Sequence, residues 1–172
     1  QLLQTVNEAD TSILSNITTV KMYKVITPTL SSALKYTLAF NNALYNPHSG
    51  HNSSGGGIIS STGFKINNDS SVNEHFLDDD GTGVLRVYYL SDTTRVYTDA
   101  TYGTVDYATG EVILTSANIT AISNVDGATS TQIRIFAVPS SNDIVPVRNQ
   151  VLSIDTSNST ITGEVDGIIS GG

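Results

Sequence analysis

The sequence contains no cysteine and no tryptophan, and only one methionine among its 172 residues. Without cysteine the chain has no disulfide framework and no thiolate metal cluster, so its stability depends on packing and backbone pairing. Charged residues make up only 14% of the chain, and the net charge is −8. Because the eight lysines and arginines are scattered singly, we expect no binding to nucleic acid and no binding to a membrane surface.

Long apolar runs are lacking as well. No stretch approaches the roughly 20 apolar residues of a membrane-spanning helix, and the first residues lack the basic start and apolar run of a signal peptide. The length suits a single domain that buries roughly 70% of its unfolded surface. We divide the chain into a helical lead-in over residues 1–16, a β-rich assembly domain over residues 17–155 and a weakly structured segment over residues 156–172.

The lead-in has the apolar spacing of a short amphipathic helix. Apolar residues recur there every three or four positions, at Leu2, Leu3, Val6, Ala9 and Ile13. The pattern is already under way at Gln1, so we expect the lead-in to be the tail of a longer, truncated helix.

Alternating apolar and polar residues predict strands through most of the domain. The clearest pattern is that of Leu34, Tyr36, Leu38 and Phe40, which predicts a strand with one buried face. The other expected strands lie at residues 18–26, 57–66, 74–77, 84–90, 133–137 and 145–155, with a hairpin at residues 103–115 around the left-handed glycine Gly110. The predicted fold is mainly β, an antiparallel sandwich or barrel-like arrangement of sheets with hairpins and a short N-terminal helix.

The polar segment at residues 41–57 is the first candidate site, because loops on a β scaffold commonly carry function. It contains Tyr45, Asn46, His48 and His51. Two histidines three residues apart chelate a metal only when further ligands converge on them, and the neighbouring asparagines and serines are poor zinc ligands. We expect these histidines to hydrogen-bond within the loop and predict no metal there.

Other chemical motifs are incomplete. The acidic run at residues 78–81 lacks the ligand spacing of a calcium loop, and we interpret it as a turn whose side chains bond their own backbone. The glycines at residues 55–57 are not followed by the Lys-Ser/Thr of a phosphate loop, and no Gly-x-Ser-x-Gly elbow is present. We predict neither an enzyme nor a cofactor.

The segment at residues 142–155 reads as an edge strand, since Pro146 bars it from the middle of a sheet. Its single basic residue is Arg148. This arginine either anchors a partner or is a solvated surface charge, and the sequence leaves both readings open.

Six segments in a fixed order resemble one protein family: residues 8–16 (EADTSILSN), 40–52 (FNNALYNPHSGHN), 76–81 (FLDDDG), 103–116 (GTVDYATGEVILTS), 122–131 (ISNVDGATST) and 142–155 (NDIVPVRNQVLSID). They are similar to the C-terminal part of the baseplate wedge protein of contractile-tailed, T-even-type phages, in its cyanophage version. The resemblance implies a structural component of the virion, located in the tail baseplate and assembled in the host cytoplasm. It also implies a homodimer that helps to close a ring around the tail hub and contacts other wedge proteins.

On this hypothesis the partner-contact residues are Tyr45, Asn46, His48, His51 and Arg148, with Tyr45 and Arg148 favoured because tyrosine and arginine are enriched in interface cores. One alternative is a carbohydrate- or receptor-binding β-domain of a phage or bacterial surface protein, although the absence of tryptophan removes the usual sugar-stacking platform. Another is a metal-dependent hydrolase that uses His48 and His51.

Overall fold

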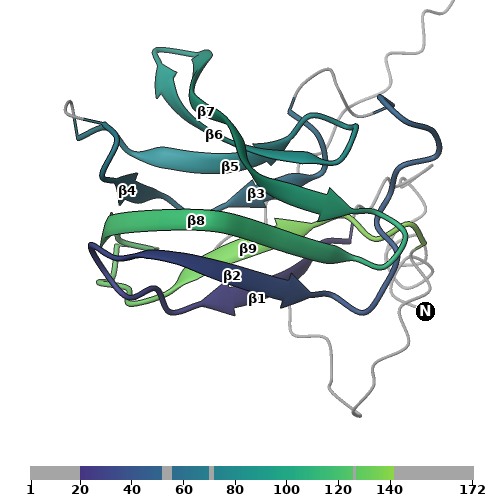
Figure 1. Cartoon of the computed structure of the whole chain (residues 1–172), viewed down its shortest axis with the longest axis horizontal. Helices are drawn as coiled ribbons and strands as arrows, with labels where there is room; N and C mark the ends of the chain where they lie inside the picture. Colours follow the sequence, from purple (N-terminus) through teal and green to yellow (C-terminus); the bar gives the residue numbers. More distant parts are fainter. Residues whose placement is uncertain (1–19, 52–55, 70–71, 126, 142–172) are drawn as a thin grey trace, which may run out of the picture.

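The computed structural model describes residues 20–51, 56–69, 72–125 and 127–141 of the chain (Figure 1). The predicted helix in residues 1–16, the predicted strand at residues 145–155 with Arg148, and the segment 156–172 lie outside the described residues. All described residues belong to the segment predicted as the β-rich domain.

The described residues form nine strands and no helix, which confirms the mainly β prediction for this part of the chain. The strands are β1 (Met22–Ile26), β2 (Ala33–Ala39), β3 (Ile59–Ser61), β4 (Phe64–Ile66), β5 (His75–Asp79), β6 (Val84–Ser91), β7 (Thr94–Asp106), β8 (Glu111–Ile122) and β9 (Ile133–Ala137).

Five of these strands close into an antiparallel barrel. β4, β5, β6 and β7 are neighbours in that order, and β8 completes the circle by pairing with both β7 and β4. The β7 pairing uses residues 111–114 of β8, and the β4 pairing uses residues 119–122. β2 joins this sheet by pairing with the other side of β8 and ends it there.

A second antiparallel sheet, in the order β1-β9-β3, packs against the barrel sheet. Its buried residues belong to the same hydrophobic core as those of the barrel: Ile59, Ile133, Ile135 and Ala137 from the second sheet, and Leu77, Val87, Val112 and Leu114 from the barrel. Figure 1 draws β1 and β2, the terminal strands of the two sheets, at the same edge of the molecule. Asn42, just after β2, donates through Nδ2 to Met22 Sδ at 3.6 Å.

The predicted extended segment at residues 57–66 is divided between the two sheets. β3 pairs with β9 and β4 pairs with β8. The crossing lies at Thr62 and Gly63, because the Thr62 amide donates to Arg134 O at 3.0 Å and Gly63 O accepts from Ser123 N at 3.0 Å. One stretch of sequence thus holds the two sheets together.

The hairpin predicted at residues 103–115 is confirmed as part of the longer pair β7 and β8. Its connection runs over the four residues from Tyr107 to Gly110. Gly110 has a left-handed φ of 73°, and a Cβ there would lie 2.1 Å from Asn42 O. Glycine is therefore required twice over, by the backbone conformation and by the close approach of the loop after β2.

The buried face predicted for residues 34–40 is only half correct. Leu38 and Phe40 are buried, whereas Leu34 is 41% exposed. The register of β2 on β8 shifts between Leu34 and Tyr36, and β2 is a terminal strand, so its first half lies outside the core.

The hairpin of β6 and β7 has no strong sequence signal. Ser91 pairs with Thr94 across a two-residue turn in which Asp92 has a φ of 56°. Two-residue hairpins usually carry Asn-Gly or Asp-Gly, and here Thr93 stands in place of the glycine. In Figure 1 the tip of this hairpin projects beyond the body of the barrel.

Candidate functional site

The loop that follows β2 brings together the four candidate residues it was predicted to contain. Its first part is fixed to the end of β9, since Leu44 forms a bridge with Pro139 and the Tyr45 amide donates to Val138 O at 3.0 Å. Its second part contacts the turn after β5, where Gly81 O accepts a hydrogen bond from the Gly50 amide at 2.9 Å. The Asn46 side chain also points to Gly81 O, at 3.5 Å.

The two loop histidines contact each other at the surface. His51 Nδ1 lies 3.1 Å from His48 Nε2, and the ring centroids are 4.8 Å apart in an edge-to-face arrangement. Tyr45 meets His51 edge to face with centroids 5.5 Å apart. No three His, Cys, Asp or Glu side chains of the described residues converge as a metal site requires. Arg148, the fifth candidate, lies outside the described residues.

The acidic run at residues 78–81 is not the turn that the sequence predicted. Asp78 and Asp79 are the last residues of β5 and are 1% and 0% exposed. Asp80 does bond the turn backbone as expected, since its Oδ1 accepts from Thr82 N at 2.8 Å and from Val84 N at 2.9 Å. The prediction was wrong because aspartate is rare in strands and in cores, and tertiary partners reverse that preference here.

Asp79 fastens the second sheet to the barrel. Its Oδ1 accepts from Ile59 N, the first residue of β3, at 2.7 Å and from the preceding Ile58 N at 2.6 Å. Its Oδ2 accepts from the Tyr107 hydroxyl at 2.5 Å and from Gly81 N at 3.3 Å. Burial, and next the bond to the Asp79 carboxylate, raises the pKa of Tyr107 above its ordinary value. Within the described part of the chain the two sheets share no backbone hydrogen-bond ladder with each other, and this one buried carboxylate links them through charge-assisted hydrogen bonds.

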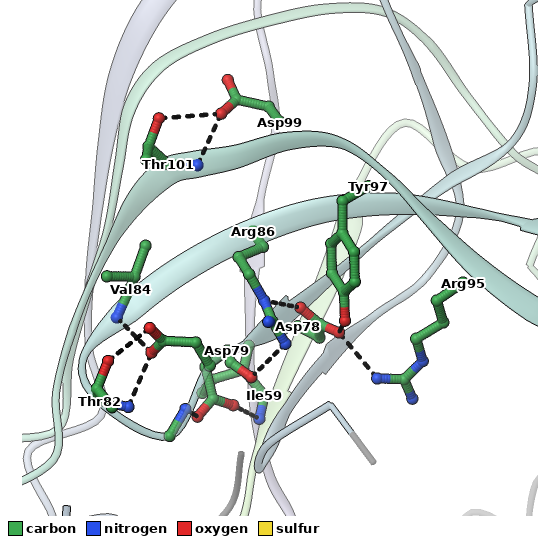
Figure 2. A network of polar contacts seen from close by, with 12 residues as sticks. Ile59, Asp78, Asp79, Thr82, Val84, Arg86, Arg95, Tyr97, Asp99 and Thr101 are labelled. Atoms are coloured by element: carbon green, nitrogen blue, oxygen red, sulfur yellow. Dashed lines mark hydrogen bonds and ion pairs between the residues drawn. The ribbon is translucent and has the colours of Figure 1, made fainter. Parts of the chain in front are cut away.

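Asp78 points to the opposite face of β5, where it joins two arginines (Figure 2). Its Oδ1 accepts from Arg86 Nε at 2.9 Å, and its Oδ2 accepts from Arg95 Nη1 at 2.8 Å. The Tyr97 hydroxyl donates to the same Oδ2 at 2.8 Å. Because three charged or polar donors satisfy one buried carboxylate, the cluster is fixed in position before any partner arrives.

We name the surface around this cluster the Arg–Tyr face. It consists of Phe76, Asp78, Arg86, Tyr88, Leu90, Arg95 and Tyr97. Each guanidinium covers a tyrosine ring of the neighbouring strand, with Arg86 Cζ 4.3 Å from the centroid of Tyr97 and Arg95 Cζ 4.7 Å from that of Tyr88. Tyr97 is 40% exposed, and Leu90, which pairs with Arg95, is 50% exposed. The face therefore offers aromatic and apolar area to solvent.

Sequence reasoning missed the Arg–Tyr face, although a signal was present. The tripeptide Arg-Val-Tyr occurs twice, at residues 86–88 and 95–97. On two antiparallel strands that pair Tyr88 with Tyr97, this spacing places both arginines on the tyrosine side and diagonal to the opposite ring.

A second surface lies along the two terminal strands, and we name it the β1–β2 edge. Its exposed apolar residues are Tyr23, Val25, Leu30 and Leu34, at 60%, 44%, 49% and 41% exposure. Its exposed basic residues are Lys21, Lys24 and Lys35. Lys24 lies on β1 and Lys35 on β2, the terminal strands of two different sheets, and Lys21 directly precedes β1.

Buried His75 at the start of β5 makes stability depend on pH. Burial lowers the pKa of His75 below 6.5, even though Asp69 Oδ2 lies 3.5 Å from its Nε2. The unfolded chain therefore takes up this proton at a higher pH than the folded chain. The contribution of His75 to stability is complete above pH ~6.5 and declines as the pH falls toward the folded-state pKa.

We expect the His75→Gln variant to lose this slope in urea unfolding measured at several pH values between about 5 and 7.5. The exposed His48→Gln variant serves as the control and should keep the slope of the wild type. If His75→Gln retains the wild-type slope in that interval, another group is responsible.

Comparison with protein-family models, with curated proteins and with solved structures gives no match to this chain. None of the described residues belongs to a helix long and apolar enough to cross a membrane.

Proposed function

We propose that this chain is a self-associating structural domain of a phage tail baseplate, and that two copies meet through the Arg–Tyr face. The assignment to a baseplate wedge rests on the ordered sequence segments that resemble that family. In this proposal the domain works in the virion, contacts other wedge proteins and carries out no catalysis. The Arg–Tyr face is the observation that supports association.

The composition of the face suits an interface core. Tyrosine and arginine combine a large contact area with polar tips, and they are the residues most enriched among binding hot spots. The half-exposed Tyr97 and the exposed Leu90 supply the area, while Asp78 lies beneath them at 1% exposure. Little side-chain freedom remains to be lost on association, because the bonds to Asp78 and the stacking contacts already order both arginines.

Charge also favours this face. Two copies with a net charge of −8 each repel one another at long range. The Arg–Tyr face carries two guanidinium groups that are paired with one carboxylate, so most of its charge is neutralised within the face. Two copies can approach there at a lower electrostatic cost than through an acidic surface. We expect added salt to strengthen the association by screening the remaining repulsion.

Light scattering after size-exclusion chromatography tests this proposal. We expect a concentration-dependent dimer, and we expect Leu90→Glu to weaken it by at least about tenfold in Kd, or roughly 1.4 kcal/mol, because association must then remove a charged group from water in place of an apolar one. Leu34→Glu is the matched control, since it makes the same change at a similarly exposed leucine on the β1–β2 edge. It should leave the dimer intact.

A strict monomer at high micromolar concentration would contradict self-association by this domain. A dimer that Leu34→Glu disrupts and Leu90→Glu does not would instead move the contact from the Arg–Tyr face to the β1–β2 edge. Circular dichroism of each variant verifies that the fold is retained.

A further inference from the structure

We propose that the β1–β2 edge binds an extended acidic segment of another protein, which adds as a strand to β1. This site is separate from the Arg–Tyr face, and it does not require that two copies of the chain associate. It rests on the open strand edges, on the apolar side chains beside them and on the distribution of charge.

The first observation is that both strands are terminal in their sheets. Among the described residues, β1 pairs only with β9, and β2 pairs only with β8. The outer side of each strand therefore presents backbone N–H and C=O groups that no described strand uses. Such an edge is a template for an added strand, whose affinity comes from main-chain hydrogen bonds.

The second observation is a row of apolar side chains along β1. Tyr23 and Val25 stand two residues apart and so share the outer face of the sheet, where they are 60% and 44% exposed. The ring of Tyr23 packs at 6.0 Å, centroid to centroid, on that of Phe136 in β9. An added strand would lay every second side chain against this row, which gives the contact selectivity for apolar residues at alternate positions.

The third observation is the charge. Residues 11–68 contain Lys21, Lys24, Lys35 and Lys65 but no aspartate or glutamate, although the whole chain carries a net charge of −8. Three of those lysines are exposed on the β1–β2 edge, and none of the three has an ion pair with a described residue. An acidic segment matches them, whereas a basic one is repelled.

The same charge argues against a second copy as the occupant. In symmetric antiparallel pairing of β1 with β1 about its middle residue, Lys24 faces Lys24, and like charges directly opposite are unfavourable. Lysine on an edge strand is a common defence against such self-pairing. A few lysines on a chain of net charge −8 also produce too weak a field to hold nucleic acid or an anionic membrane.

Fluorescence anisotropy with short capped peptides tests the site. One labelled peptide alternates valine with glutamate, and its counterpart alternates valine with lysine. We expect the glutamate peptide to bind the wild type at least about tenfold more tightly than the lysine peptide, and hydrogen exchange of β1 backbone amides to slow when it binds.

Reversing the edge charges provides the decisive comparison. Lys24→Glu with Lys35→Glu should reverse the preference, so that the variant selects the lysine peptide. Lys65→Glu, an equal change of charge on β4, should keep the wild-type preference. Leu90→Glu should bind the glutamate peptide like the wild type, which separates this site from the proposed self-association.

Several results would overturn the proposal. They are equal binding of both peptides, no binding of either at millimolar concentration, no reversal in the doubly substituted chain, or tighter binding of a DNA oligonucleotide or of anionic vesicles than of the glutamate peptide.

Discussion

Replacing Asp79 by alanine is expected to lower the free energy of unfolding by about 3–5 kcal/mol. The carboxylate is 0% exposed and accepts hydrogen bonds from Ile58 N, Ile59 N and the Tyr107 hydroxyl, together with Gly81 N. Its removal leaves several buried donors without an acceptor, and each such donor costs about 1–3 kcal/mol. Urea unfolding followed by circular dichroism measures the change.

The neighbouring Asp80→Ala variant is the matched control for this experiment. Asp80 also accepts from two backbone amides, but it does so in the turn, where water can replace the lost carboxylate. We expect a loss of about 1 kcal/mol, similar to the removal of a helix cap. Equal losses for the two variants would show that Asp79 does not fasten the two sheets together.

Replacing Gly103 by valine is the second substitution with a large expected effect, about 2–4 kcal/mol. Gly103 pairs with Leu114 where β7 and β8 close the barrel. A Cβ at this position would lie 1.8 Å from Ile113 O and 3.2 Å from the Leu114 Cα. Both neighbours are backbone atoms, so the two strands must separate locally to admit any side chain.

Thermal and urea unfolding measure that loss, and hydrogen exchange locates it. The amides of β7 and β8 near the closure should exchange faster in Gly103→Val, while those of β9 should change less. Thr104→Val is the control, since it places the same side chain at the exposed neighbouring position, and it should stay within about 0.5 kcal/mol of the wild type. A Gly103→Val chain of unchanged stability would rule out the close approach.

Local patterns were sufficient to predict the strands that have one face in the core. In β9, for example, Ile133, Ile135 and Ala137 are all at most 1% exposed, because a period of two follows directly from the geometry of a strand. The hairpin around Gly110 was predictable for a similar reason, since its glycine conformation is a local requirement. Neither pattern contains information about which strands pair across the sheet.

Long-range pairing explains what the sequence did not predict. In the sequence Asp78 and Asp79 have the pattern of a turn. The groups that donate hydrogen bonds to their carboxylates lie on β3, β6 and β7, and those contacts are not local. Of the candidate site residues, Tyr45, Asn46, His48 and His51 do lie in one loop, as adjacent residues must, but whether they contact a partner stays a prediction.

The pairing of β1 with β9 has a consequence for the synthesis of the chain. It joins Met22 to Ala137, so the contact closes a loop that spans nearly all of the described residues. The hairpin of β6 and β7, by contrast, turns at Asp92 and needs only neighbouring residues. On the ribosome β1 emerges before β9 and lacks this partner until β9 has been made, and closing so long a loop is slow. During that interval we expect the lysines on and beside β1 to hinder its pairing with the same strand of other unfinished chains.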